Sequence, residues 1–281
     1  MIETFLSLFS SPQILKIIVI ALVVGLSVSV CSALLGVNLV LKKYAMIGDG
    51  LSHVGYGALS IAAALKLSGN YTLEIALPIV IVAAFFILKM SGSKVGGDAA
   101  IAVVSVVSLA VGTILLNLSG GTASDACNSL FGSASLITIT EKDMVLSLIL
   151  SAVVIALYVI FWRKIFLITF DEDYARAIGL KVDTYNLVLS ILTAVTIVLG
   201  MQLMGAILIS GLIILPTLTA LKVSKSFLSV LINSVIISSV CFILGFTLAL
   251  ILNLQMGPSI VVANFVLYLL LSLITSIKTH K

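Results

Sequence analysis

LVLKKYAMIGDGLSHVGYGALSIA, residues 39–62, joins two apolar runs through a pair of lysines and carries an aspartate and a histidine inside the second run. Runs of this kind, each close to the ~20 residues that a helix needs to cross a bilayer, recur along all 281 residues. Hydrophobic residues make up 61% of the chain and charged residues 9%, against about a quarter in soluble domains. The sequence predicts an all-α, polytopic protein of the lipid bilayer, with no soluble domain and no nucleic-acid partner.

Charged residues and clusters of Gly, Asn and Ser divide the apolar sequence into candidate membrane spans. We expect a single domain, 1–281, with about eight or nine transmembrane helices. An even number would follow if the first or the seventh segment were interfacial or re-entrant. The nine segments cover residues 17–40, 45–67, 73–90, 99–118, 143–162, 184–201, 203–221, 227–252 and 259–277.

The positions of the basic residues favour the odd count. With nine spans and the N-terminus outside, 12 of the 15 Lys and Arg residues lie inside, as the positive-inside rule requires. Only Lys16, Lys66 and Lys142 remain outside. Adding or losing one span would spoil this distribution.

The N-terminal residues do not predict a cleaved signal peptide, and the cysteines do not predict disulfide bonds. Residues 1–13 lack the basic, apolar and small-residue regions of a cleaved signal peptide, so we expect the first span to target the chain. Cys31, Cys127 and Cys241 are widely separated and odd in number, which argues against a disulfide framework or a CxxC metal site. We interpret them as small apolar residues that fill space between helices.

Of the eleven acidic residues, Asp49 is the one that falls well inside a predicted span. If the helix begins near Lys43, Asp49 lies ~9 Å and His53 ~15 Å from the inner face, which places the histidine near mid-bilayer. A carboxylate at such a depth costs about 2.5–3.5 kcal/mol on insertion scales, so ionisable residues there usually face a cavity or a partner. The i, i+4 spacing predicts that both side chains lie on one helix face.

A carboxylate oxygen with an imidazole nitrogen suits a borderline divalent metal ion such as Zn²⁺ or Mn²⁺. Two alternatives stay open: an Asp–His hydrogen bond that only stabilises the fold, and a proton relay, since imidazole titrates near neutrality. Two ligands do not complete a four-coordinate site, and the only other histidine, His280, lies in the C-terminal tail. A second copy of the chain would supply the same pair again. Met201, Gln202, Met204 or water are other possible ligands.

The longest inside connection, residues 163–186, contains a helix signal of its own. The acidic residues 171–173 suit the N-terminus of a short helix, and Gly179 suits its end. Apolar side chains at i, i+3 and i+4 give this helix one apolar face: Tyr174, Ala177 and Ile178. The segment is either a connector on the membrane surface or a docking element for a cytoplasmic partner.

The stretch quoted first resembles the signature of the ABC-3 family, the membrane subunits of bacterial zinc and manganese ABC importers. In that family two basic residues precede a Met-x-Gly-Asp-x-x-x-His pattern, which is matched here by Lys42, Lys43, Met46, Gly48, Asp49 and His53. Further family segments are resembled, in order, by NSLFGSASLITITEKD (128–143), FDEDYARAIGL (170–180) and MGAILISGLIILPTLTALKVSKSF (204–227). Gly50 stands where alanine is common, a change of up to ~1 kcal/mol in helix propensity that leaves the ligands untouched.

The resemblance implies a type II ABC-importer permease, similar in fold to the vitamin B12 and siderophore importers, in the bacterial cell membrane. It implies a homodimer that takes Zn²⁺ or Mn²⁺ as substrate from an extracellular metal-binding lipoprotein and is driven by a cytoplasmic ATPase dimer, with no prosthetic group. Asp49 and His53 would be metal ligands, and imidazole slightly favours zinc. Segment 163–183 would hold the coupling helix, whose expected ATPase-contacting residues are Asp171, Glu172, Tyr174, Ala175, Ala177, Ile178 and Gly179.

The chain is expected to be a transport subunit and not an enzyme. No GxxxxGK[ST] phosphate loop is present, because GSKVGG at 92–97 has its glycines and lysine in the wrong order. The main alternative is a stand-alone, proton-coupled secondary metal carrier that uses Asp49 and His53. An intramembrane enzyme is disfavoured, since there is no HExxH motif, no second intramembrane aspartate and no nucleophile beyond Ser52.

Overall fold

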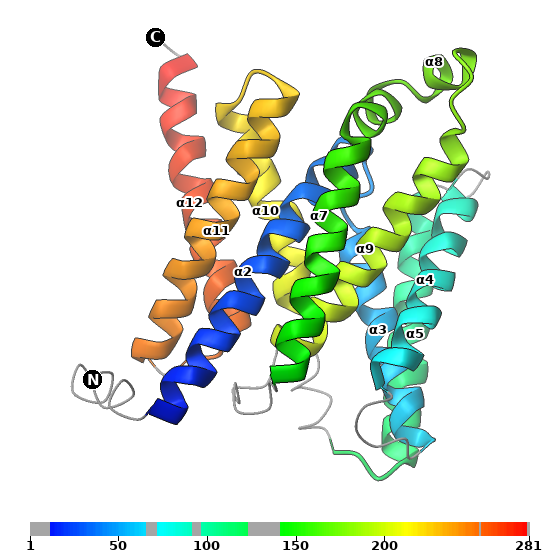
Figure 1. Cartoon of the computed structure of the whole chain (residues 1–281), viewed down its shortest axis with the longest axis vertical. Coiled ribbons are helices and arrows are strands. Elements are labelled where there is room, and N and C mark those ends of the chain that lie inside the picture. The colour runs from blue at the N-terminus through cyan, green and yellow to red at the C-terminus, as the bar shows by residue number, and fades with distance from the viewer. Residues whose placement is uncertain (1–11, 66–71, 92–96, 123–140, 253, 280–281) are drawn as a thin grey trace.

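The structure is a computed structural model, and it describes residues 12–65, 72–91, 97–122, 141–252 and 254–279. All the regular elements in these ranges are helices, and the long ones run side by side as a bundle (Figure 1). Their bounds are α2 (Pro12–Leu41), α3 (Ile47–Ala64), α4 (Thr72–Ser91), α5 (Gly97–Leu118), α7 (Glu141–Phe170), α8 (Glu172–Ala177), α9 (Val182–Met204), α10 (Ala206–Val223), α11 (Phe227–Leu252) and α12 (Met256–Thr279).

The long helices in the described ranges correspond one to one with the nine expected spans, which confirms the all-α class. The largest departure is α7, which we expected to end at residue 162 and which continues to Phe170. It continues because Ile165 and Ile168, spaced i, i+3, are both buried against neighbouring helices. The predicted connection 163–183 is therefore the end of α7 followed by the short α8 and its flanking turns.

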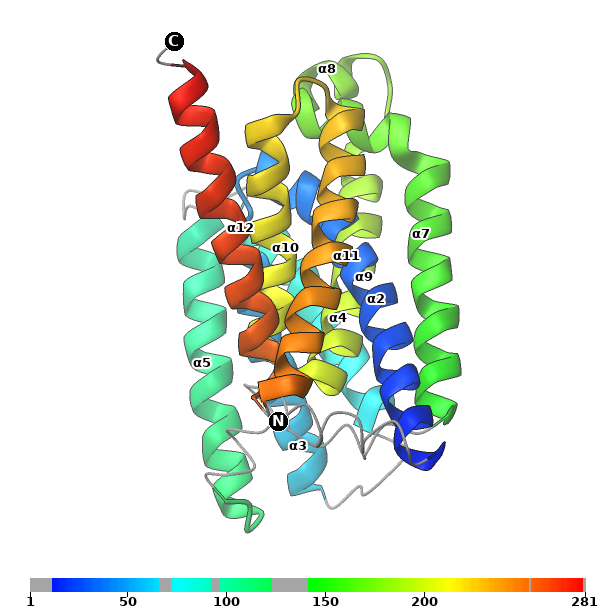
Figure 2. The same cartoon turned by 90° about the vertical axis from the view of Figure 1, so that its left-hand side faces the viewer.

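Seven of the described helices are long and apolar enough to cross a membrane by length and composition. The apolar part of α4 is shorter, Ile75–Ile87, and α3 is less apolar because it carries Asp49, His53 and several glycines. The first described helix begins at one end of the bundle and α12 ends at the opposite end, where α8 also lies (Figures 1 and 2). This arrangement agrees with an odd number of crossings, with α8 on the side to which the basic residues assign the cytoplasm.

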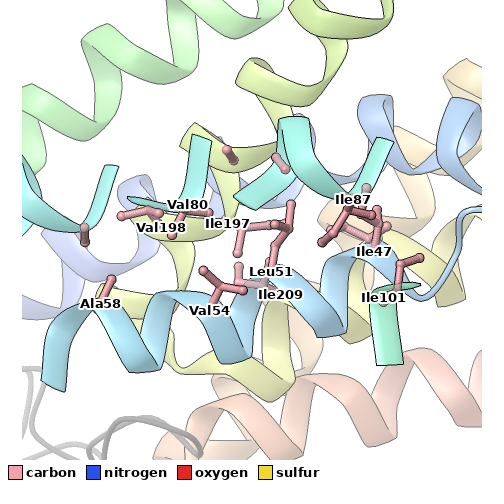
Figure 3. Packing of buried hydrophobic residues seen from close by; sticks show 14 of the residues in the cluster. Ile47, Leu51, Val54, Ala58, Val80, Ile87, Ile101, Ile197, Val198 and Ile209 are labelled. Atoms are coloured by element: carbon pink, nitrogen blue, oxygen red, sulfur yellow. The ribbon is translucent and has the colours of Figure 1, made fainter. Parts of the chain in front are cut away.

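Small residues let α3 pack inside the bundle. Leu51, Val54 and Ala58 lie on one face of α3, in an apolar cluster with residues of α4 and α9 (Figure 3). On the side of α5, a Cβ atom added at Gly57 would lie only 3.0 Å from the carbonyl oxygen of Ser108. Glycine at this contact therefore lets the two helix backbones approach closely, as is usual in membrane bundles.

Two tight junctions position the polar residues of the bundle. After α2 the chain turns through Lys43, the one non-glycine residue with positive φ (64°) in the part that the structure describes. Gly205, with φ 90° and ψ 157°, alone joins α9 to α10, in a backbone region that only glycine adopts readily. Because of this junction, α9 extends to Met204 and the seventh span begins at Ala206 instead of 203.

Candidate functional site

Asp49 and His53 lie on one face of α3, as their spacing predicts. The Nε2 atom of His53 is 3.6 Å from Oδ2 of Asp49, which is ion-pair distance for a protonated imidazole but too long for a good hydrogen bond. The Nδ1 atom of His53 is buried and has no hydrogen-bond partner among the described residues. The pair is therefore not a closed Asp–His unit, since its polar atoms retain capacity for a further ligand.

The direction of the pair follows from its neighbours on α3. At about 100° per residue, Asp49 lies between Gly48, which packs on Ile213 of α10, and Gly50, which packs on Ile101 of α5.

The side chain of Asp49 is 45% exposed and that of His53 is 22% exposed, although the same helix buries Leu51 completely. Ser210 of α10 also packs beside Gly48, the residue before Asp49. The pair thus faces outward between α5 and α10.

The described part of the chain offers no group of three or more His, Cys, Asp or Glu side chains that could hold a metal ion. Met201 and Met204 are buried in packing contacts, Met201 against Gly55 and Met204 in an apolar cluster with Phe242. His280 and the side chain of Gln202 lie outside what the structure describes. Within the described residues, Asp49 and His53 therefore have no third side chain of this kind beside them that would extend the pair to a four-coordinate metal site.

Tyr56 is a polar residue next to the pair that the sequence analysis did not single out. It follows His53 by one helical turn, and a Cβ atom at Gly112 of α5 would lie 2.9 Å from its ring. Its hydroxyl is buried and has no hydrogen-bond partner among the described residues. The i, i+3 spacing from His53 was the signal that could have identified it.

The helix signal at 171–173 is confirmed as α8. The backbone of Asp171 is extended and its side chain accepts a hydrogen bond from the Tyr174 amide, 2.8 Å, as an N-cap does. Gly179 ends the helical segment with φ 85°, a left-handed conformation suited to glycine. Arg176 and Asp183 form an exposed 2.7 Å ion pair that joins α8 to the start of α9.

The apolar face of α8 points away from its own chain. Tyr174 and Ile178 are 55% and 52% exposed, and Ala177 is exposed as well. Ala175, which we expected among the partner contacts, is instead fully buried in a small cluster with Ile168 of α7 and Val182 of α9. Its methyl group holds α8 in place, so direct contact with a partner is left to the exposed side chains.

Lys42, which the sequence analysis used only for topology and as part of the family pattern, contacts α8 directly. Its ammonium donates to Glu172 Oε1 at 2.7 Å and to Asn186 Oδ1 of α9 at 2.8 Å. Burial raises the pKa of the Glu172 carboxyl, but the Lys42 ammonium and the neighbouring polar groups outweigh burial and hold that pKa below its usual value. Glu172 is therefore committed to an intramolecular contact.

A bundle of long apolar helices, with a carboxylate–imidazole pair on α3 and a short exposed helix at one end, is the architecture of a polytopic membrane protein. The family model described as the ABC 3 transport family matches residues 14–275, and the chain belongs to this family. Membership confirms the resemblance on which the assignment as an ABC-type metal-importer permease rests. The protein is a multi-pass protein of the bacterial plasma membrane.

Three curated relatives cover most of the chain. A metal transport system membrane protein of Thermotoga maritima is 33% identical over 89% of this chain and 86% of its own length. The high-affinity zinc uptake membrane protein ZnuB of Haemophilus influenzae is 29% identical, with 89% and 94% covered. The manganese import permease ScaB of Streptococcus gordonii is 27% identical, with 89% and 88% covered. The family therefore includes proteins named for either metal.

A solved structure shares the whole fold. A chain of PsaBC from Streptococcus pneumoniae, solved in complex with a Fab, superposes with a TM-score of 0.81 at 26% identity and covers 96% of this chain and 95% of its own. A likeness over nearly the full length of both chains confirms the expected ABC-importer permease architecture.

Proposed function

We propose that this chain is the membrane permease of an ATP-driven importer that carries Zn²⁺, or alternatively Mn²⁺, into the cytoplasm. The observation that carries the proposal is the outward position of Asp49 and His53 between α5 and α10, with the imidazole Nδ1 atom left without a partner among the described residues. A ligand pair placed this way suits a substrate that passes along α3.

Two copies of the chain would complete the metal site. Each chain supplies one carboxylate and one imidazole, so a two-fold axis beside α3 would bring together the four ligands that a tetrahedral ion accepts. A site shared in this way could open and close as the copies move relative to each other. We therefore expect one metal ion per two chains, measured by equilibrium binding to the purified dimer.

We take zinc as the preferred substrate, because an imidazole nitrogen is a ligand that suits Zn²⁺. The ligand set alone separates these ions weakly, and the relatives named above include a zinc and a manganese system. Selectivity would then rest largely on the protein that delivers the metal from outside the cell.

The ATPase that drives transport would act on the exposed face of α8. Tyr174, Ala177 and Ile178 expose apolar surface on the segment of α8, which lies at one end of the bundle (Figure 1), and a groove of an ATPase dimer would bury this surface. The metal would be delivered at the opposite end by an extracellular binding lipoprotein. The chain itself would act as a transport subunit, with ATP hydrolysis on the separate ATPase.

Uptake into proteoliposomes tests this proposal. The permease would be reconstituted with the ABC ATPase and the metal-binding protein of the same organism, and the entry of ⁶⁵Zn²⁺ would be followed with and without ATP. Unlabelled Mn²⁺ as competitor would rank the two ions. We expect uptake that requires ATP and the binding protein.

The other outcomes identify the alternatives. Uptake that needs no ATPase and follows a pH gradient would make the chain a proton-coupled secondary carrier. Competition by Mn²⁺ at lower concentration than by unlabelled Zn²⁺ would reverse the preferred metal. No uptake of either ion under any of these conditions would refute the proposal as a whole.

A further inference from the structure

The end of α2 carries a second charged cluster, separate from Asp49 and His53. Lys42 donates to Glu172 at 2.7 Å and to Asn186 at 2.8 Å, and Asn186 in turn donates to the same Glu172 oxygen at 3.2 Å. The Lys42 side chain is only 9% exposed. One ammonium group therefore joins three elements: the end of α2, the short α8 and the first turns of α9.

The chain between Lys42 and Asp49 is held by backbone hydrogen bonds over most of its length. The Lys42 amide donates to Asn38, and two residues later the Tyr44 amide donates back to Leu39, at 2.9 and 2.8 Å. The Ile47 amide then donates to Tyr44 at 3.0 Å, which starts α3. Asp49 stands in the first turn of that helix. A displacement of Lys42 is thus passed to the start of α3 instead of being absorbed by a loose loop.

One turn before Lys42, a second polar contact fixes α2 to the helix that leads into α8. Asn38 Nδ2 donates to the Tyr158 hydroxyl at 2.7 Å, and the Thr169 hydroxyl donates to Asn38 Oδ1 at 3.1 Å. Both partners belong to α7, three turns apart. Asn38 and Lys42 lie on one face of α2 by their i, i+4 spacing. The end of α2 is therefore held to α7, α8 and α9 together.

The small cluster of Ile168, Ala175 and Val182 makes α8 part of the same unit, because it packs α8 against α7 and α9. A force on the exposed face of α8 would move this unit as one piece. The only ion pair between α8 and α2 in the described part of the chain is Lys42–Glu172. Because the Lys42 side chain is buried, water hydrates its ammonium group poorly when the ion pair breaks.

We propose that Lys42, held by Glu172 and Asn186, is a positioning residue that transmits the displacement of α8 to the Asp49–His53 pair at the start of α3. This inference rests on the proposed function, since it assumes that an ATPase acts on α8 and that the pair handles the metal. It adds a residue and a route to that function. Lys42 touches neither metal nor ATPase on this route and acts only through its neighbours.

The test measures coupling, the number of metal ions imported per ATP hydrolysed, in proteoliposomes that hold permease and ATPase. Lys42→Met keeps an apolar stem of similar length but removes the ammonium, and Glu172→Gln keeps the shape but removes the charge. We expect each variant to import at least tenfold fewer ions per ATP, while it still assembles with the ATPase and still hydrolyses ATP.

A matched control is available four residues along the chain from Glu172. Arg176 and Asp183 form an ion pair of the same length, 2.7 Å, that joins α8 to α9 but not to α2, and Asp183 is 82% exposed. Asp183→Asn removes the negative charge from an equally short ion pair that does not involve Lys42. We expect this variant to keep the wild-type number of ions per ATP.

Chemical rescue separates a transmitting charge from simple structural damage. Lys42→Cys would be prepared in a background in which Cys31, Cys127 and Cys241 are replaced by alanine. Aminoethylation of the single introduced thiol rebuilds a lysine-like ammonium, whereas methylation blocks the thiol without charge. Coupling should return with the first reagent and not with the second.

The outcomes are decisive in both directions. Wild-type coupling in Lys42→Met, equal rescue by both reagents, or loss of assembly with the ATPase in Lys42→Met would each overturn the inference. If the wild-type complex itself imports no metal with ATP, the proposed function fails before Lys42 is tested. A wild-type complex that couples, with a Lys42→Met variant that hydrolyses ATP but does not import, supports both.

Discussion

Two pairs of ionisable side chains, Lys42–Glu172 and Asp49–His53, have their first members only seven residues apart in the sequence. They differ in how many of their polar atoms have hydrogen-bond partners. Lys42 and Glu172 are 2.7 Å apart, and Asn186 bonds to both. Asp49 and His53 are 3.6 Å apart, and one imidazole nitrogen has no partner among the described residues. The first pair is closed by its own chain, while the second leaves a buried imidazole nitrogen without a partner among those residues.

We expect the closed pair to act by holding its elements together and the open pair, as proposed above, to act by binding the metal. A closed, partly buried ion pair holds its elements together, and removing one partner leaves an uncompensated charge. An open pair adds little to the fold and keeps its ligand capacity for a substrate. Substitutions at the two places should therefore affect different properties, and the following experiments test whether they do.

The largest effect is expected at the open pair. If Asp49 and His53 are direct ligands, as proposed, Asp49→Ala and His53→Ala should each lower metal uptake by more than the ~10–100-fold that loss of an outer-shell partner typically causes. Assembly and stability should persist, since Asp49 is partly exposed and its loss removes a charge from a membrane helix. Uptake into proteoliposomes and size-exclusion chromatography measure the two properties.

Ser52→Ala is the matched control on the same helix, because the Ser52 hydroxyl donates to the backbone carbonyl of Asp49 and is buried. It should transport at the wild-type rate. Wild-type uptake in Asp49→Ala or His53→Ala would remove the pair from the transport mechanism.

The next largest effect is expected on the exposed side of α8. Tyr174→Asp and Ile178→Asp each put a charge on a surface that a partner would bury, so each should weaken ATPase binding at least about tenfold, or ~1.4 kcal/mol. Metal binding by the isolated permease should not change. Pull-down of the ATPase and equilibrium metal binding give the two readings.

Thr184→Asp controls for added charge alone, since Thr184 is an exposed residue of α9 that follows α8 closely. This variant should bind the ATPase normally. Normal binding by Tyr174→Asp and Ile178→Asp would instead make α8 a simple connector on the membrane surface.

An effect on stability instead of partner binding is expected where α3 packs on α5. In Gly57→Ala the new Cβ would lie 3.0 Å from the backbone oxygen of Ser108, which cannot move without the helix, so we expect a loss of about 1–3 kcal/mol in stability. In Gly50→Ala it would lie 2.6 Å from Ile101 Cγ2, an atom of a buried, β-branched side chain that can shift only as far as its neighbours allow, but that is not fixed to the helix backbone. The gain of up to ~1 kcal/mol in helix propensity is the same at both positions and offsets part of each cost, so we expect the smaller loss for Gly50→Ala.

Thermal unfolding in detergent compares the two glycine variants. A larger loss for Gly50→Ala than for Gly57→Ala would show that Ile101 is held rigidly and that the packing beside Asp49 is tighter than the contacts indicate. That result would contradict our expectation that the contact between α3 and α5 beside Asp49 can adjust.

Most of the fold could be predicted from the sequence, because long apolar runs bounded by charge leave few alternatives in a bilayer. The bounds of α11 were predicted without error. The errors fell where tertiary packing decides the helix end: Ile165 and Ile168 carry α7 past two basic residues, and one glycine turns α9 into α10. These tertiary contacts cannot be predicted from the pattern of apolar and charged residues along the chain.

The candidate site could be predicted only in part. The i, i+4 spacing placed Asp49 and His53 on one face, and the acidic start and glycine end defined α8. Periodicity did not show that Ala175 faces inward or that Lys42 contacts Glu172, 130 residues away. Partners so distant in sequence become neighbours only through the packing of the whole bundle.

The smallest effect is the pH dependence of the closed pair. The pKa of Glu172 is lowered in the folded protein, so the stability that its charge contributes is fully present above the unfolded pKa of about 4.3 and is lost as the pH falls through the lowered folded value. Because the Glu172 side chain is 42% exposed, we expect a contribution of only about 0.2–1 kcal/mol. The difference in unfolding free energy between wild type and Glu172→Gln should stay constant from about pH 8 to 5 and shrink below about pH 4.

Asp183→Asn, at the exposed pair with Arg176, should show a smaller difference throughout, because solvent screens that pair more strongly. A difference for Glu172→Gln that instead grew as the pH fell would mean that the folded protein prefers a protonated Glu172. The Lys42 cluster would then not be an ion pair, and the contrast between a closed and an open charged pair would fail on its closed side.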